Sequence, residues 1–165
     1  MKKVATITIV SLVCLAVAMF MLTCGLLIAN PYITHNTMLK DNIAKLSHTQ
    51  EFEFNTIIPF EWDEMYVFTP GTSKEYIEET INISHSKIYA VPEDAKVNTT
   101  IFVKDGKITA YMTDAENINF NVYMETENHG VISYNDWYVF VAENKDGIVN
   151  ISDMMLYRDR IMKFA

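Results

Sequence analysis

The sequence predicts an α+β fold in which an N-terminal transmembrane helix precedes a small domain of two helices packed on an antiparallel meander sheet of five or six strands. Residues 4–29 contain no charged side chain, which is typical of a membrane-spanning helix. Residues 39–82 contain two short stretches with apolar residues at helical spacing. Residues 87–152 contain several strand-like segments and two Asp-Gly turns, which favour hairpins.

The apolar segment over residues 4–29 predicts the location of the protein. As a helix it would extend about 39 Å, more than the roughly 30 Å of hydrocarbon in a bilayer. Lysines precede it, and no further Lys or Arg follows until Lys40, so residues 1–3 are expected to form a cytoplasmic stub. We therefore expect a single-pass protein of the cell membrane, held in the membrane by residues 4–29. Residues 30–165 would then form one domain outside the cytoplasm.

Two other fates of this segment stay open. Ala16-Val17-Ala18 has the small-x-small pattern of a signal-peptide cleavage site, although cleavage there would leave an apolar N-terminus beginning at Met19. Cys24 could carry a lipid, although Met21 and Thr23 depart from the usual residues before a lipidated cysteine. Both alternatives also place the domain outside the cytoplasmic membrane.

The composition narrows the classes of partner. The chain has a net charge of −8, and a surface so acidic repels phosphate backbones, so nucleic acid is not an expected partner. The simplest role of such charge is to keep a surface protein soluble. Both cysteines, Cys14 and Cys24, lie in the apolar segment, so the domain is expected to fold without disulfides.

The first helix of the domain is predicted after Asn30-Pro31, where proline ends the apolar segment. Leu39, Ile43 and Leu46 recur at spacings of four and three residues, which indicates an amphipathic helix of about 12 residues. Its candidate N-terminal caps are Thr34, Asn36 and Thr37.

A second, shorter helix is predicted to begin at residue 72. Thr72-Ser73-Lys74-Glu75 has the pattern of a capping box, with Thr72 as N-cap and Glu75 bonding back to it. Tyr76, Ile77 and Ile81 would form the buried stripe of this helix, which is expected to end near Asn82.

A central strand is predicted between these helices, within residues 57–68. Trp62 and Tyr66 would lie on one face of it, and Met65 and Val67 on the other. Apolar side chains on both faces indicate a strand that is covered on both sides. The remaining predicted strands span residues 87–91, 98–104, 107–112, 117–124, 137–143 and 147–152.

The densest group of aromatic residues includes the candidate site. Trp62 and Tyr66 are most simply interpreted as core aromatics, and Asp63 as a turn residue that satisfies backbone N–H groups. In the alternative interpretation, Trp62, Asp63 and Tyr66 form a partly exposed interaction edge, because aromatic residues often anchor interfaces.

The same region resembles a known type of protein. Residues 59–72 contain the pattern Phe-x-Trp-Asp-x-x-Tyr-x-Phe-x-Pro-x-Thr. This pattern is similar to a stretch in small uncharacterised exported or lipoprotein-type proteins of Gram-positive bacteria. Those proteins have a tyrosine after the proline, where this chain has Gly71. The resemblance implies a small extracytoplasmic α+β domain and assigns no activity to it.

Motifs of catalysis and metal binding are absent from the sequence. Residues 30–165 contain histidines but no cysteine, and neither a calcium-loop pattern nor a Gly-x-Ser-x-Gly elbow occurs. Neighbouring carboxylates such as Asp63 and Glu64 would point to opposite faces of a strand, so they cannot act as a pair. We therefore predict no metal, no cofactor and no enzymatic activity.

The function predicted from these observations is that of a membrane-anchored extracytoplasmic binding or interaction module of the bacterial cell envelope. An envelope protein is its candidate partner. Two alternatives stay open. One is an inhibitor or immunity-type protein that sequesters an enzyme or toxin on its acidic face. The other is an envelope hydrolase whose carboxylates converge only in the fold.

Overall fold

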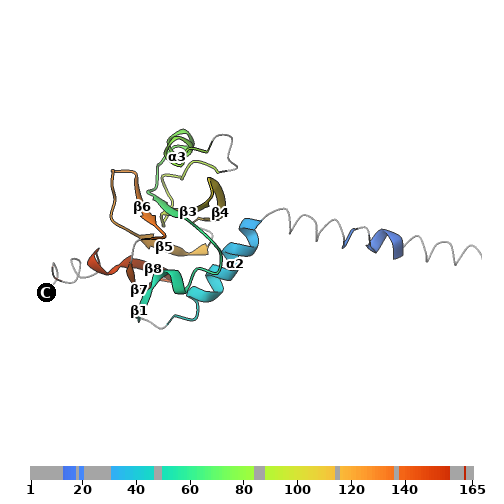
Figure 1. The fold of residues 1–165 in the computed structure, drawn as a ribbon, viewed down its shortest axis with the longest axis horizontal. Helices are drawn as coiled ribbons and strands as arrows, with labels where there is room; N and C mark the ends of the chain where they lie inside the picture. The colour runs from blue at the N-terminus through green and yellow to red at the C-terminus, as the bar shows by residue number, and fades with distance from the viewer. Residues whose placement is uncertain are drawn as a thin grey trace, which may run out of the picture.

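The predicted α+β class is confirmed by the structure. The computed structural model describes residues 13–17, 19–20, 31–46, 50–83, 88–113, 116–135, 138–156 and 162. In this part of the chain, eight strands form two four-stranded sheets. Figure 1 shows α3 (Lys74–Thr80) above one sheet and the second sheet below it. α2 (Pro31–Ile43) lies at the side of the sheets.

The sheet next to α3, here the central sheet, is antiparallel throughout and has the order β4-β3-β2-β6. Its strands are β2 (Glu64–Phe68), β3 (Thr99–Lys104), β4 (Lys107–Met112) and β6 (His129–Ser133). Met65 and Val67 of β2 pack into a core between the two sheets, the inter-sheet core. Tyr66 and Phe68 pack into a second core beneath α3, the α3 core. The prediction of a central strand covered on both faces is therefore confirmed.

The other sheet, the outer sheet, has the order β1-β7-β8-β5. Its strands are β1 (Gln50–Glu53), β5 (Ile118–Asn121), β7 (Val139–Lys145) and β8 (Ile148–Asp153). Phe52, Phe120 and Phe140 point from three of these strands into the inter-sheet core, where they are at most 8 % exposed. The 3-10 turn η1 (Phe54–Thr56) follows β1 and adds Phe54 to the same core.

Both predicted hairpins are present and have the expected turns. Asp105 and Gly106 connect β3 to β4 with φ of 49° and 68°, and Asp146 and Gly147 connect β7 to β8 with φ of 54° and 80°. Two consecutive residues with positive φ match the twist of the flanking strands, and Asp-Gly adopts this conformation readily.

The predicted antiparallel meander is wrong. β5 pairs with β8 in parallel, and β6 returns to the far edge of β2 instead of pairing with the strand before it. The strand predicted over 87–91 is also wrong, because residues 88–91 are a loop, with residue 87 outside the described part. Ile88 and Val91 supply buried side chains to the α3 core, but hydrogen bonds tie Val91 to the residues before α3. Burial of both side chains therefore does not require a strand.

α2 has the predicted buried stripe but not the predicted start. Leu39 and Ile43 are at most 2 % exposed in the inter-sheet core, whereas the helix begins at Pro31, a residue favoured in the first helical turn. Asn36, a predicted cap, instead bonds the edge strand β4. Its amide donates to the carbonyl of Tyr111 at 2.5 Å and accepts from the N–H of Tyr111 at 3.1 Å. His35 adds a contact between Nδ1 and the carbonyl of Thr109 at 2.6 Å.

The N-cap of α3 lies one residue later than predicted. The Ser73 hydroxyl, not that of Thr72, accepts the N–H of Tyr76 at 3.2 Å and so caps the helix. Thr72 is 3 % exposed and donates to the carbonyl of Thr69 at 2.6 Å, so its hydroxyl stabilises the preceding turn instead. Ile77 and Ile81 face the α3 core as predicted.

The predicted transmembrane helix is contradicted. Among the described residues, no helix is both long and apolar enough to cross a membrane. Within the predicted span of 4–29, the described residues are 13–17 and 19–20, and they are helical. The single-pass membrane location inferred from that helix is corrected accordingly. Cys24, the candidate lipidation site, lies outside the described residues.

Candidate functional site

Trp62 lies at the open edge of the inter-sheet core, just before β2 begins. Its ring meets those of Phe54 and Phe102 edge-on, with centroids 5.6 and 5.9 Å away. Its third aromatic neighbour is Tyr134, at 5.4 Å and 82° between the ring planes. Trp62 is 3 % exposed, whereas Tyr134 is 48 % exposed. The prediction that Trp62 is a core aromatic is confirmed, and Tyr134 links it to the surface.

Two adjoining pockets open on Trp62, and we refer to them together as the Trp62 cleft. The first has a volume of about 230 Å³ and is lined by Glu53, Phe54, Asn55, Trp62, Ile132, Tyr134, Asn135 and Tyr138. The second has a volume of about 340 Å³ and is lined by Asn55, Ile58, Phe60, Glu61, Trp62, Asp63, Lys104 and Tyr134. Asn55, Trp62 and Tyr134 line both pockets, so the two pockets share part of their walls.

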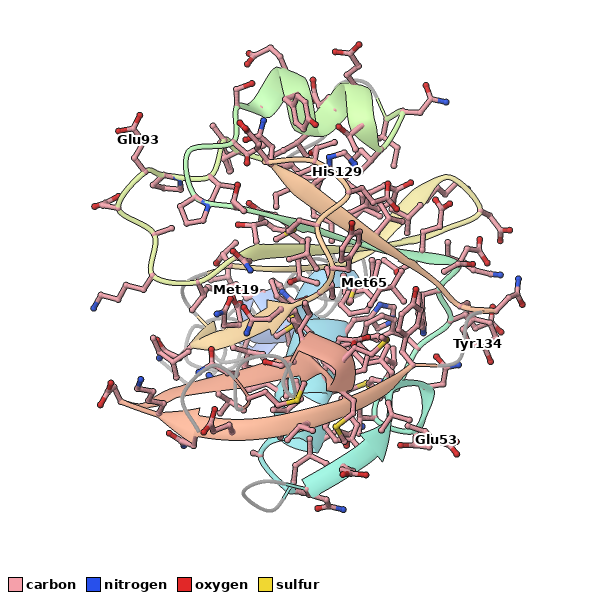
Figure 2. All side chains as sticks on the ribbon, turned by 90° about the vertical axis from the view of Figure 1, so that its left-hand side faces the viewer. Met19, Glu53, Met65, Glu93, His129 and Tyr134 are labelled. Atoms are coloured by element: carbon pink, nitrogen blue, oxygen red, sulfur yellow. The ribbon has the colours of Figure 1, made fainter. Side chains whose placement is uncertain are left out.

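The walls of the cleft come from the ends of β1 and β6, and hydrogen bonds hold them together. The N–H of Tyr134 donates to the carbonyl of Asp63 at 2.7 Å, and the N–H of Phe54 to that of Tyr138 at 3.4 Å. The Asn55 amide also donates to the carbonyl of Tyr134, at 3.4 Å. Figure 2 shows Glu53 and Tyr134 on the same side of the molecule, one from each sheet. The cleft therefore lies where the two sheets meet.

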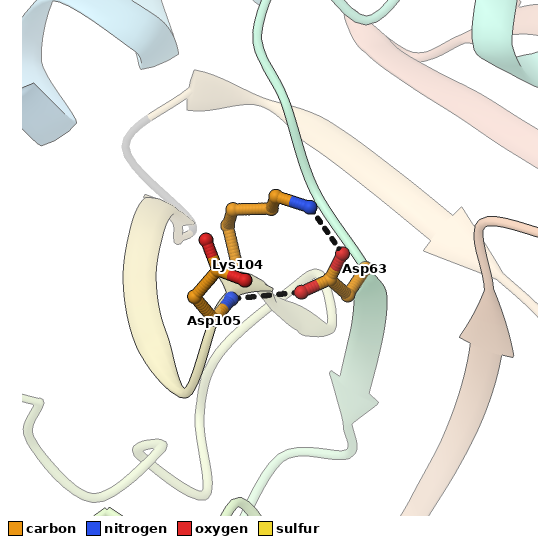
Figure 3. Close-up of polar contacts among 3 residues, drawn as sticks. All are labelled: Asp63, Lys104 and Asp105. Carbon is orange, nitrogen blue, oxygen red and sulfur yellow. Dashed lines mark hydrogen bonds and ion pairs between the residues drawn. The ribbon is translucent and has the colours of Figure 1, made fainter.

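Asp63 forms a charged contact at the rim of the cleft (Figure 3). Its carboxylate accepts from Lys104 Nζ at 2.6 Å and from the N–H of Asp105 at 2.7 Å. The hydrogen bond from Lys104, followed by that from Asp105, lowers the pKa of Asp63 below its ordinary value. The bond to Asp63 in turn raises the pKa of Lys104. Asp63 thus satisfies a backbone N–H of the β3–β4 turn, the turn role expected from the sequence.

Tyr66 lies on the opposite face of β2 from the cleft. It is 9 % exposed in the α3 core, and its hydroxyl donates to Glu64 Oε2 at 2.6 Å. Burial, and then the hydrogen bond to Glu64, raises the pKa of Tyr66 well above its ordinary value. The structure therefore brings Trp62 and Asp63 of the predicted interaction edge together at the cleft and places Tyr66 elsewhere.

The indole N–H of Trp62 has no hydrogen-bond partner among the described residues, and it does not belong with the buried, unpartnered side-chain atoms there, of which Thr100 Oγ1 is the example. We infer that this N–H faces the cleft, because Trp62 lines both pockets. An acceptor placed in the cleft would satisfy it.

The polar groups of the cleft do not form a metal site. Within the described ranges, no three His, Cys, Asp or Glu side chains are grouped so that they could hold a metal ion. His129, which lies in β6 outside the cleft, bonds through Nδ1 to the hydroxyls of Tyr76 and Thr126 at 3.0 and 2.9 Å. Lying between α3 and the 126–129 turn, this histidine joins the helix to the central sheet.

Comparison with known proteins gives no match: no family model, no curated protein and no solved structure is similar to this chain. The resemblance of residues 59–72 to exported Gram-positive proteins stays a prediction.

Proposed function

We propose that this protein is a binding module that recognises another protein through the Trp62 cleft. The supporting observation is the pairing of a buried Trp62, whose N–H opens to the cleft, with a half-exposed Tyr134 that contacts it at 5.4 Å. Tryptophan and tyrosine are the residues that most often anchor protein interfaces, and they do so from well-packed pockets surrounded by polar groups. Asn55, Asn135 and Glu53 supply such a polar rim.

The size of the recess also favours a partner side chain over a small-molecule cofactor. Small-molecule sites commonly enclose about 300–1,000 Å³. Taken singly, the two pockets have volumes of about 230 and 340 Å³, close to the lower end of that range. A recess of this size suits one or two side chains of a protruding loop.

The inhibitor or immunity-type alternative is a special case of this proposal, and the net charge of −8 favours it if the partner is basic. The hydrolase alternative has less support. Asp63 of the cleft has a lowered pKa and gives its oxygens to Lys104 and Asp105, so it is a poor general acid. The same acidic charge argues against nucleic acid as a partner.

The proposal can be tested with the full-length chain carrying Trp137→Phe, which leaves Trp62 as its tryptophan. The indole N–H signal of Trp62 would be followed by NMR during titration with blocked basic, acidic and apolar peptides and with chitotriose. We expect at least one peptide to shift this signal saturably. Tyr134→Ala should abolish the shift, whereas Tyr123→Ala, which removes a 75 % exposed tyrosine outside the cleft, should not.

Two results would contradict the proposal. One is a Trp62 signal that no peptide shifts. The other is equal weakening of binding by Tyr134→Ala and Tyr123→Ala, which would mean that the cleft is not the binding site. Binding and cleavage of chitotriose would instead establish the hydrolase alternative.

A further inference from the structure

The Trp62 cleft has a chemistry that selects among protein partners. We propose that it receives a cationic side chain, arginine or lysine, presented on a loop of a basic protein. This inference rests on the proposed function and specifies what the cleft recognises. It draws on the charges that line the cleft, the exposed ring of Tyr134 and the open N–H of Trp62.

The charges that line the cleft leave an excess of carboxylates. Glu53, Glu61 and Asp63 line it together with one ammonium group, that of Lys104. Lys104 is bound at 2.6 Å to Asp63, and Glu61 acts on it only through its field. Among the described residues, Glu53 and Glu61 form no ion pair, and both are exposed. The cleft therefore has negative charge that a cation from outside can neutralise.

Tyr134 supplies a face on which a cation can rest. Its ring meets Trp62 edge-on, at 82°, and its backbone N–H donates to the carbonyl of Asp63 at 2.7 Å, while 48 % of the residue stays exposed. A cation within about 6 Å of an aromatic face is attracted by the ring quadrupole, and arginine uses this contact most often. The Tyr134 ring can therefore pack against the apolar part of the partner's arginine or lysine side chain. It can also attract the positive charge of that side chain, in addition to the carboxylates.

The open N–H of Trp62 requires an acceptor, which a cationic side chain does not supply. The peptide carbonyl beside that side chain does supply one, since every residue of the partner loop carries a backbone acceptor. The cleft therefore matches a basic residue together with its own backbone. A free amine or guanidinium compound would leave this donor unsatisfied, which favours a polypeptide over a small cation.

The test uses two blocked pentapeptides that differ in charge alone. One is acetyl-Gly-Gly-Arg-Gly-Gly-amide, and the other has citrulline, the neutral isostere of arginine, in place of the arginine. Each is titrated into the full-length chain carrying Trp137→Phe, and the Trp62 indole signal is followed. We expect the arginine peptide to bind at least about tenfold more tightly than the citrulline peptide, and added salt to reduce this difference.

Variants of the chain test the carboxylates directly. The double variant Glu53→Gln, Glu61→Gln should weaken binding of the arginine peptide about tenfold and leave the citrulline peptide unaffected. Glu93→Gln is the matched control, because Glu93 is exposed and Figure 2 shows it on the opposite side of the molecule from Glu53 and Tyr134. It should leave both affinities unchanged.

The outcomes separate this inference from the proposed function. Equal binding of both peptides, abolished by Tyr134→Ala, would overturn the cationic preference and leave the cleft as a peptide site. A shift of the Trp62 signal by chitotriose but by neither peptide would overturn both the inference and the protein partner. If Glu93→Gln weakened binding of the arginine peptide as much as the double variant does, the inference would also be overturned. The net charge of the protein, and not the carboxylates of the cleft, would then attract the peptide.

Discussion

The two cores of this molecule share β2 and β3 but differ in composition and in closure. The inter-sheet core is aromatic, with rings from both sheets such as Phe54, Phe102, Phe120 and Phe140 packed at centroid distances of 4.5–6.4 Å. The α3 core is mostly aliphatic and is covered by α3 and the loop after it. Only the aromatic core opens onto the Trp62 cleft, since both pockets are lined by its residues and not by those of the α3 core.

The largest expected effect follows removal of the ring that joins the aromatic core to its cleft. Trp62→Ala should cost about 3–5 kcal/mol, the range for deletion of a buried aromatic side chain. This is a large part of a total stability of about 5–15 kcal/mol. Urea denaturation would measure it. Trp62→Phe keeps a ring and should recover most of the loss, and a transition midpoint unchanged by Trp62→Ala would show that the ring does not stabilise the core.

The next effect tests how closely β6 approaches the chain at residues 122–123. A Cβ at Gly130 would overlap the carbonyl oxygen of Tyr123 and come within 2.8 Å of Val122 Cγ2, so the backbone would have to move. Gly130→Ala should therefore cost about 3 kcal/mol, at the upper end for overpacking. In Gly106→Ala the new Cβ meets open space but φ is +68°, and the expected cost is about 1–2 kcal/mol. Equal midpoints for the two variants in thermal unfolding would refute the predicted overlap.

A smaller effect of opposite sign is expected inside the aromatic core. Thr100 is fully buried, and its hydroxyl has no hydrogen-bond partner among the described residues. Thr100→Val keeps the shape and removes the unsatisfied group, so it should stabilise the protein by about 1 kcal/mol. Thr109→Val is the contrasting variant, because the Thr109 hydroxyl donates to the carbonyl of Phe102 at 3.2 Å. Thr109→Val should therefore destabilise the protein. If Thr100→Val also destabilised it, the Thr100 hydroxyl would have a hydrogen-bond partner after all.

The smallest effect concerns the charged rim. The pKa of Asp63 is lowered by Lys104, so the stability from this contact is present above the ordinary pKa of 3.8 and is lost as pH falls through the lower folded-state value. The contribution of Lys104 is present below its ordinary 10.5 and is lost as pH rises through its raised pKa. Asp63→Asn should lower the melting temperature slightly between about pH 5 and 9. Its difference from the unsubstituted chain should disappear once the pH falls below the lowered pKa of Asp63, and a difference that persists there would rule out this ion pair as the cause.

The elements that were predicted correctly are those with local signals. The Asp-Gly pairs determine both hairpins through their own backbone preferences, and Leu39 and Ile43 mark the buried face of α2. The sequence does not predict β1 and β6, because their pairing is not local. β1 has a single buried residue, Phe52, and β6 begins with His129-Gly130, so neither strand has a clear apolar alternation.

The cleft itself could be predicted only in part. The sequence predicts Trp62 and Asp63 as candidate residues, but it places Trp62 on the face of Tyr66 because the predicted strand includes Trp62. β2 begins at Glu64, and the backbone before it turns Trp62 toward the inter-sheet core instead. No local sequence pattern predicts that Tyr134 lies at the cleft, because its position depends on the pairing of β6 with β2. Contacts between residues so distant in sequence depend on the topology, which local patterns do not specify.

The bond between Asn36 and Tyr111 has a consequence for association between copies. The Asn36 side-chain amide bonds both the backbone N–H and the carbonyl of Tyr111 on the edge strand β4. Another strand therefore cannot pair with Tyr111 while α2 is docked. Edge-to-edge pairing therefore first requires α2 to detach, with exposure of Leu39 and Ile43. The free energy of that local opening, and not of global unfolding, then sets the fraction of molecules able to aggregate through this edge.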